Sequence, residues 1–67
     1  MTFYKWLINN YLENDDPFGD LAKDVKSDDG FPKEAKDWKT IEEYLESKRA
    51  SFAAIDTAKE AYKKYQE

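Results

Sequence analysis

The sequence predicts an all-α fold, a compact bundle of four helices with a fifth, short helical turn as an alternative. Apolar residues recur at spacings of three and four, as on the buried face of a helix, and no stretch alternates apolar and polar residues as a strand would. Residues that favour helix starts and ends separate these stretches. A chain of 67 residues forms one domain at most, which we place over residues 1–67.

Large side chains have to supply the stability of this domain, because the chain offers no covalent or metal cross-link. It contains no cysteine and no histidine, whereas 16% of its residues are aromatic. Each aromatic side chain can bury roughly 150 to 250 Å², and disordered chains are poor in such residues. We therefore expect a folded protein with neither a structural metal nor a cofactor.

Thr2 can cap a first helix that runs to about Leu12. Phe3, Leu7 and Tyr11 follow one another at intervals of four and form an apolar row along this helix. A second apolar row lies beside the first. We therefore expect the helix to be covered on more than one side and to be the central helix of the bundle.

The second helix is expected to begin at Pro17, because Asp16 is a favourable N-cap and proline fits the first helical position. Its apolar face consists of Phe18, Leu21, Ala22 and Val25. Gly19 in the first turn costs about 1 kcal/mol relative to alanine, which indicates either close packing or a shifted start. Gly30 can end the helix in the left-handed conformation.

The residues after this turn lead into the third helix. Pro32 favours an extended conformation of Phe31, which suits a side chain that turns back into the core. Asp37 and Thr40 are alternative caps, and we favour Asp37 because it brings the following tryptophan into register with the apolar face. We expect Trp38 to be buried, so that its replacement by alanine costs about 3 to 5 kcal/mol.

The start of the last helix is open from sequence. Ser51 would cap one long helix with Phe52 on its apolar face, whereas Asp56 would cap a shorter helix after a separate turn. Both alternatives place Tyr62 on a buried stripe. The predicted core, collected from the whole chain, comprises Phe3, Leu7, Tyr11, Phe18, Leu21, Val25, Phe31, Trp38, Ile41, Leu45 and Tyr62.

Catalysis and metal binding are poorly supported by this sequence. Without histidine or cysteine, acid–base or nucleophilic chemistry would fall to other side chains, and no serine lies in a nucleophile-elbow pattern. The segment Asp28-Asp29-Gly30 is similar to the middle of a calcium loop, but that register places Val25 and Lys36 where carboxylates are required. We expect neither an enzyme nor a metal site.

The charges suggest two kinds of partner. Acidic residues are concentrated before residue 30 and basic residues after residue 47, and such opposite patches favour head-to-tail association, although capping and solubility explain the same charges. The candidate protein-interaction residues are Asp20, Asp24, Lys48 and Arg49. The candidate nucleic-acid residues are Lys59, Lys63 and Lys64, interleaved with Tyr62 and Tyr65. The net charge of −4 disfavours nucleic acid.

No membrane association is expected. The longest apolar run, Trp6 to Ile8, is far shorter than the roughly 20 residues that a membrane-spanning helix needs. Met1 is not followed by the basic and apolar regions of a secretory signal. These observations predict a soluble cytoplasmic protein.

Several short motifs occur together in a characteristic order. They are Phe3-Tyr4, Trp6-Leu7, Phe31-Pro32-Lys33, Asp37-Trp38 with Ile41, Tyr44-Leu45-Glu46, and Ala61-Tyr62 with Tyr65. Over nearly its whole length the chain thereby resembles the YozE-like family of small proteins from low-GC Gram-positive bacteria. It departs from the family at Trp38, where tyrosine is expected, and at Tyr62, where tryptophan is expected.

The resemblance implies an orthogonal helical bundle with a sterile-alpha-motif-like (SAM-like) fold and transfers no active site. Domains similar to this often associate through complementary surfaces. We therefore expect a non-catalytic protein–protein interaction module whose partner is another protein or, weakly, a second copy of the chain. Nucleic-acid binding through the basic last helix is the alternative.

Overall fold

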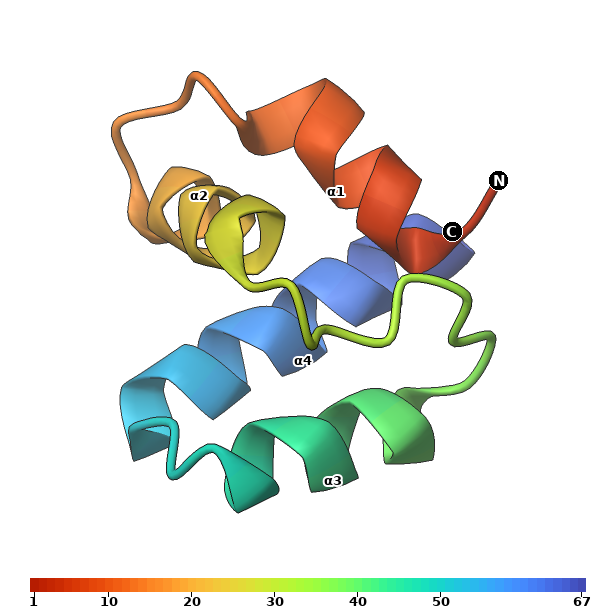
Figure 1. Ribbon diagram of the computed structural model, residues 1–67. Helices are drawn as coiled ribbons and strands as arrows, with labels where there is room; N and C mark the ends of the chain where they lie inside the picture. Colours follow the sequence, from red (N-terminus) through yellow and green to blue (C-terminus); the bar gives the residue numbers. More distant parts are fainter.

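The computed structural model describes residues 1–67 as four α-helices without any strand. The helices are α1 (Phe3–Tyr11), α2 (Pro17–Ser27), α3 (Trp38–Ser47) and α4 (Phe52–Gln66). α4 packs against all three other helices, whereas α3 packs directly against α4 alone. Figure 1 shows α4 running between α1 and α2 on one side and α3 on the other, and the Tyr65 hydroxyl near its end lies 2.6 Å from the Met1 carbonyl oxygen.

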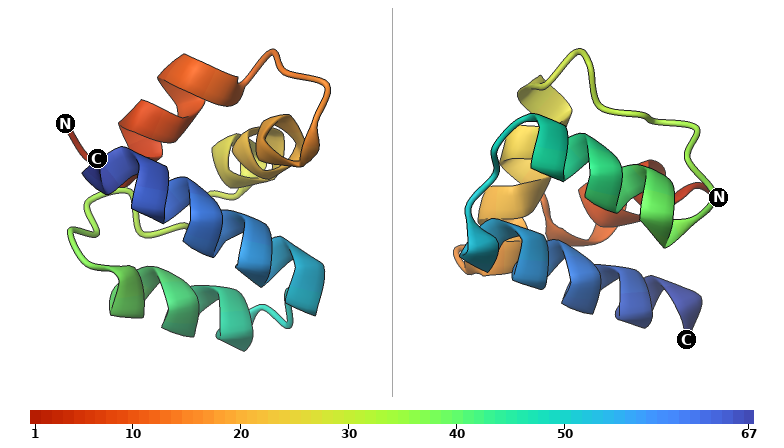
Figure 2. Two further views of the ribbon diagram at one scale, coloured as in Figure 1. Left: turned by 180° about the vertical axis from the view of Figure 1, so that it is seen from behind. Right: turned by 90° about the horizontal axis from the view of Figure 1, so that it is seen from below.

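The expectation that the first helix is central is therefore wrong. α1 packs only against α2 and α4, although its Phe3 and Leu7 side chains are almost completely buried. α4 takes the central place because its 15 residues make it the longest helix, long enough to reach α3 on one side and both α1 and α2 on the other (Figure 2).

Each helix begins where a capping side chain accepts a hydrogen bond from a free backbone N–H group. The four bonds run from Lys5 N to Thr2 Oγ1 (3.3 Å), Gly19 N to Asp16 Oδ1 (2.9 Å), Thr40 N to Asp37 Oδ2 (3.2 Å) and Ala54 N to Ser51 Oγ (3.1 Å). The preference for Asp37 over Thr40 is confirmed. For the last helix, Ser51 and not Asp56 is the cap, so the long version is correct.

The core is a single cluster of buried side chains drawn from all four helices and the loop before α3. Its members are Phe3, Leu7, Leu21, Ala22, Val25, Phe31, Ile41, Leu45, Ala58, Ala61 and Tyr62. Three predicted core residues, Tyr11, Phe18 and Trp38, are instead partly buried at its edge. Trp38 packs on Tyr62 with 5.8 Å between ring centroids. Because it is only partly buried, we now expect its truncation to cost less than the roughly 3 to 5 kcal/mol of a fully buried aromatic residue.

Gly19 allows the first turn of α2 to lie directly against the preceding loop. A Cβ atom at this position would lie 1.9 Å from the carbonyl oxygen of Asn14, far inside van der Waals contact. The helix nevertheless starts at Pro17 as predicted. Close packing, and not a shifted start, therefore explains the glycine.

Gly30 has a different role from the one expected. No glycine in the chain has a positive φ, so the predicted left-handed ending of the second helix is wrong. The Asp28 carboxylate supplies the turn instead, because its Oδ1 accepts the Gly30 N–H at 3.0 Å. A Cβ atom on residue 30 would lie 3.0 Å from the Tyr44 hydroxyl oxygen, so the close approach of Tyr44 is what favours glycine here.

Replacing Gly19 by alanine tests the packing at the start of α2. Helix propensity alone predicts a gain of about 1 kcal/mol in the free energy of unfolding. Because the new methyl group collides with backbone and not with a flexible side chain, we expect a loss of about 1 to 3 kcal/mol. Urea unfolding of Gly19→Ala measures the sign, and a stabilised variant would contradict the close contact.

Candidate functional site

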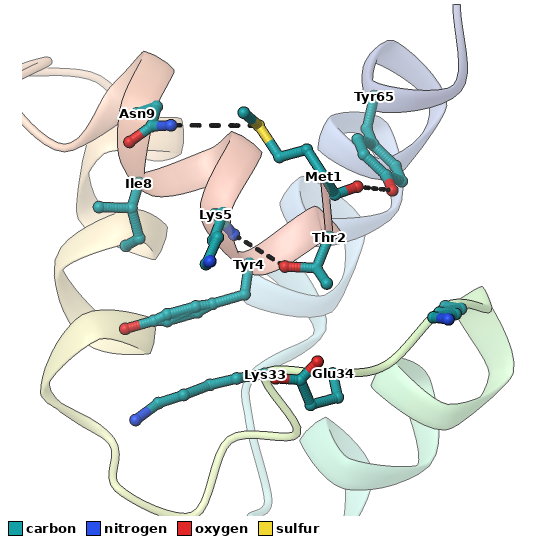
Figure 3. Close-up of a pocket in the computed structure, with 10 residues that line it drawn as sticks. Met1, Thr2, Tyr4, Lys5, Ile8, Asn9, Lys33, Glu34 and Tyr65 are labelled. Carbon is teal, nitrogen blue, oxygen red and sulfur yellow. Dashed lines mark hydrogen bonds between the residues drawn. The ribbon is translucent and has the colours of Figure 1, made fainter.

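The molecule has two surface regions suited to binding. The first, the basic groove, has a volume of about 750 Å³ and is lined by ten residues, among them Tyr4, Lys5, Ile8, Asn9, Lys33, Glu34 and Lys36. Its walls come from the first turns of α1, the loop between α2 and α3, and the end of α4 (Figure 3). These segments are far apart in the sequence, and the fold brings them together.

The charge in the groove is opposite to that of the whole chain. Lys5, Lys33 and Lys36 line the groove together with a single acid, Glu34, whereas the protein has a net charge of −4. The Lys33 ammonium lies 5.5 Å from the centre of the Tyr4 ring, within cation–π distance. Figure 3 shows the Lys33 side chain extended alongside that ring. The groove therefore combines positive charge with an aromatic surface.

Two tyrosines of α4 hold the backbone on two sides of the groove. The Tyr65 hydroxyl donates a hydrogen bond to the Met1 carbonyl oxygen at 2.6 Å, and the Tyr62 hydroxyl donates to the Lys36 carbonyl oxygen at 3.1 Å. Burial raises the pKa of Tyr62 above its ordinary value. Two hydrogen bonds from α4 thus hold the backbone that borders the groove.

The candidate nucleic-acid residues lie on the exposed side of α4. Lys59, Lys63 and Lys64 are all exposed. Tyr62, by contrast, is buried, and its ring packs on Phe3 with 5.2 Å between centroids. A base could not stack on Tyr62 without opening the core, whereas Tyr65, the second tyrosine that the sequence suggested, is only partly buried.

The second region surrounds the start of α4 and is called the α4 end surface; it comprises Asp20, Asp24, Lys48, Arg49 and Phe52. Phe52, at the first position of α4, is 90% exposed. The expectation that it lies on the apolar face of the long helix is therefore wrong. The buried stripe of α4 is formed by residues farther along the helix, and the Phe52 side chain extends into solvent.

The four candidate protein-interaction residues come from two segments. Asp20 and Asp24 line a hollow of about 190 Å³ together with Ala53 from the first turn of α4, and Lys48 and Arg49 are in the turn just before that helix. The Lys48 ammonium lies 5.9 Å from the centre of the Tyr44 ring.

Arg49 has an unusual backbone conformation for its residue type. Its φ is 59°, the only positive φ of a residue other than glycine in the chain. Its N–H bonds to the Glu46 carbonyl oxygen at 3.0 Å, and the next N–H, of Ala50, bonds to the Leu45 carbonyl oxygen at 3.0 Å. This is the Schellman pattern, in which glycine usually takes the left-handed position.

Asp28 and Tyr44 connect the end of α2 to α3. The Tyr44 hydroxyl donates to Asp28 Oδ2 at 2.5 Å. This hydrogen bond is the main cause of a lowered pKa for Asp28, and it is also the main cause that raises the pKa of Tyr44 to about 12. Asp28, which the sequence placed in a failed calcium-loop pattern, thus has a structural role.

Two further features of the structure concern metal ions and membranes. No three side chains of the histidine, cysteine, aspartate or glutamate type lie together in a way that could hold a metal ion. None of the helices combines the length and the apolar character needed to cross a membrane.

Comparison with known proteins gives one match. A family model described as the YozE SAM-like fold matches residues 2–67. Neither the curated proteins nor the solved structures gave a match. The family match supports the predicted SAM-like bundle and contributes no functional residue.

The Asp28–Tyr44 bond predicts a specific dependence of stability on pH. Because the pKa of folded Asp28 is lowered, its stabilising effect is complete above the unfolded-state pKa and is lost as the pH falls through the folded-state pKa. Because the pKa of folded Tyr44 is raised, its effect is complete below pH 10 and is lost as the pH rises towards about 12. Tyr44→Phe should therefore be destabilised most at neutral pH and approach the parent protein at both extremes. Urea unfolding over pH checks this, and a constant difference would contradict it.

Arg49→Gly should stabilise the protein. Glycine adopts the left-handed region without the cost of about 1 to 2 kcal/mol that other residues incur, and its own greater unfolded-state entropy offsets part of this gain. We expect a net increase of about 0.5 to 1 kcal/mol in the free energy of unfolding. The matched control is Lys48→Gly, at a φ of −89°, which should destabilise. Equal losses in both variants would show that the conformation of Arg49 has no cost.

Proposed function

The chain belongs to the YozE SAM-like fold family, and we propose that it serves as a non-catalytic protein–protein interaction module. The observation that carries the proposal is Phe52, a large aromatic side chain that is 90% exposed at the start of α4. Following the family resemblance, we propose that the module acts in the cytoplasm of a low-GC Gram-positive bacterium.

Phe52 has the properties of an interface anchor. Burying a phenylalanine side chain contributes about 1.5 to 3 kcal/mol, and the folded monomer leaves this contribution unused. Aromatic residues are enriched at protein interfaces, where central anchors are surrounded by polar and charged residues. Lys48 and Arg49 precede Phe52 closely in the chain, and Asp20 and Asp24 line a hollow with Ala53, the residue after Phe52, so polar and charged residues are available around this ring.

We propose a second copy of the chain as the partner, joined by a two-fold axis. An isologous contact requires one self-complementary surface. The α4 end surface supplies acidic and basic residues for charge pairing, and an exposed ring with a hollow that can receive it. The exposed Phe52 ring can enter the hollow of about 190 Å³ on the other copy, whose lining includes Pro17, Leu21 and Ala53. The acids beside that hollow would then meet the basic turn of the partner.

Nucleic-acid binding remains the alternative function. It now depends on Lys59, Lys63 and Lys64 with Tyr65, because Tyr62 is buried and Tyr65 only partly so. The net charge of −4 opposes it. A labelled oligonucleotide retained at low salt, and released by Lys63→Ala with Lys64→Ala, would favour this alternative over the interaction module.

Sedimentation equilibrium tests the dimer. The apparent mass should rise towards that of two chains with increasing concentration, and Phe52→Ala should weaken the dimer at least about tenfold because a central aromatic anchor is worth about 2 kcal/mol or more. The monomer's stability should change little, since the ring makes few contacts in it. A parent protein that stays monomeric up to millimolar concentration would contradict self-association.

A charge-swap experiment tests the two-fold geometry. Lys48→Glu with Arg49→Glu makes the surface wholly acidic, and Asp20→Lys with Asp24→Lys makes it wholly basic, so each variant alone should dissociate and their mixture should form a heterodimer. The matched control, Lys59→Glu with Lys63→Glu, makes the same charge change elsewhere and should leave the parent dimer intact. A mixture that remains monomeric would contradict this pairing of charges.

A further inference from the structure

We propose that the basic groove binds a phosphate monoester whose organic part is flat and carries hydroxyl groups, as in a nucleoside monophosphate. This site lies beside the start of α1 and shares no residue with the α4 end surface. The inference is therefore independent of the interaction proposed for Phe52.

The charged side chains of the groove determine the anionic part of the ligand. A phosphate monoester carries a charge of about −1.5 to −2 at neutral pH, which Lys5, Lys33 and Lys36 can balance. Lysine binds phosphate as a compact charge, and the chain's single arginine, Arg49, is in the turn before α4 and not in the groove. A dianionic phosphate monoester gains more than a singly charged carboxylate from three lysines.

The groove is large enough to hold a ligand bigger than a phosphate ion. Its volume of about 750 Å³ lies within the range of roughly 300 to 1,000 Å³ for small-molecule sites. Tyr4 and Ile8, both partly buried, give it an apolar wall. Asn9 and Glu34 provide an amide and a carboxylate that can bind hydroxyl groups. A phosphate, a hydroxylated middle part and a flat body fit these three features.

Lys33 and Tyr4 connect the two ends of such a ligand. In the structure the Lys33 ammonium lies over the Tyr4 ring at 5.5 Å. A bound dianion attracts this ammonium away from the ring, because a charge-assisted bond to phosphate is stronger than an exposed cation–π contact. The exposed face of Tyr4 then becomes available for a flat group to stack on it.

The backbone around the groove is already in place for binding. Tyr62 holds the Lys36 carbonyl and Tyr65 holds the Met1 carbonyl from the central helix. Binding then requires the ordering of lysine side chains and not of backbone, which lowers the entropic cost of association.

Nuclear magnetic resonance titration of the full chain with AMP tests the proposal. We expect AMP to shift the amide signals of residues 4–9 and 33–36 in a saturable way. Ribose 5-phosphate and adenosine, which each lack one part of the ligand, should bind at least about tenfold more weakly, as should inorganic phosphate. The absence of shifts at about 10 mM AMP would overturn the proposal, since this is weaker than about 3 kcal/mol of binding. Equal binding of inorganic phosphate would overturn the assignment of the organic part.

Three variants separate this site from general attraction of anions. Lys5→Gln with Lys33→Gln should weaken AMP binding at least about tenfold, because charge-assisted bonds contribute about 1.5 to 3 kcal/mol each. The control Lys59→Gln with Lys63→Gln removes the same charge elsewhere and should change binding less than about twofold. Tyr4→Leu keeps the apolar wall and should weaken AMP but not ribose 5-phosphate. Equal weakening by the two lysine pairs would overturn a specific site, and the spectra themselves show whether each variant is folded.

Discussion

A contact between the two ends of the chain supports the fold. The ring of Phe3, at the start of α1, lies 5.2 Å from the ring of Tyr62, near the end of α4, and Trp6 and Tyr65 extend this cluster. With no cysteine in the chain, burial of such rings has to supply much of the stability. α2 packs on both helices that the contact joins, and α3 is attached through α4, so every helix depends on it.

The same tyrosines that complete this core also shape the surface above it. The ring of Tyr62 is buried, while its hydroxyl reaches the backbone at Lys36, and the Tyr65 hydroxyl reaches the backbone at Met1. Tyrosine suits this position because it has an apolar body and a polar tip. Substitution of either tyrosine would therefore change stability and the shape of the basic groove together. The exposed lysines give cleaner information about binding.

The fold was predictable where the physical chemistry is local. Asp16 and Asp37 each cap a helix through an N–H three residues away, and a capping pattern of this kind can be read directly from sequence. Gly30 was misinterpreted because its constraint comes from Tyr44, which follows much later in the chain. Phe52 was misplaced because helical periodicity gives the direction of a side chain but not the extent of the helices that would cover it.

The candidate sites follow the same division. Clusters of charge on one segment, such as the acids before residue 30, were visible in the sequence. Their positions relative to one another in the folded molecule could not be predicted. The basic groove was missed altogether because its lysines come from α1 and from the loop before α3, which only the tertiary structure brings together. One local signal was present: Lys33 follows Phe31 and Pro32 in the motif that carries the family resemblance.

The turn before α4 has a consequence for protein engineering. Arg49 has a backbone conformation that favours glycine, and Phe52 exposes a large apolar surface to water. A selection for thermal stability would replace Arg49, and a selection for solubility of the monomer would replace Phe52. Both changes would be scored as improvements. Such screens commonly remove features that serve function at a cost to stability. Consensus or computational optimisation of this chain should therefore leave residues 48–52 unchanged until the proposed association through that surface has been tested.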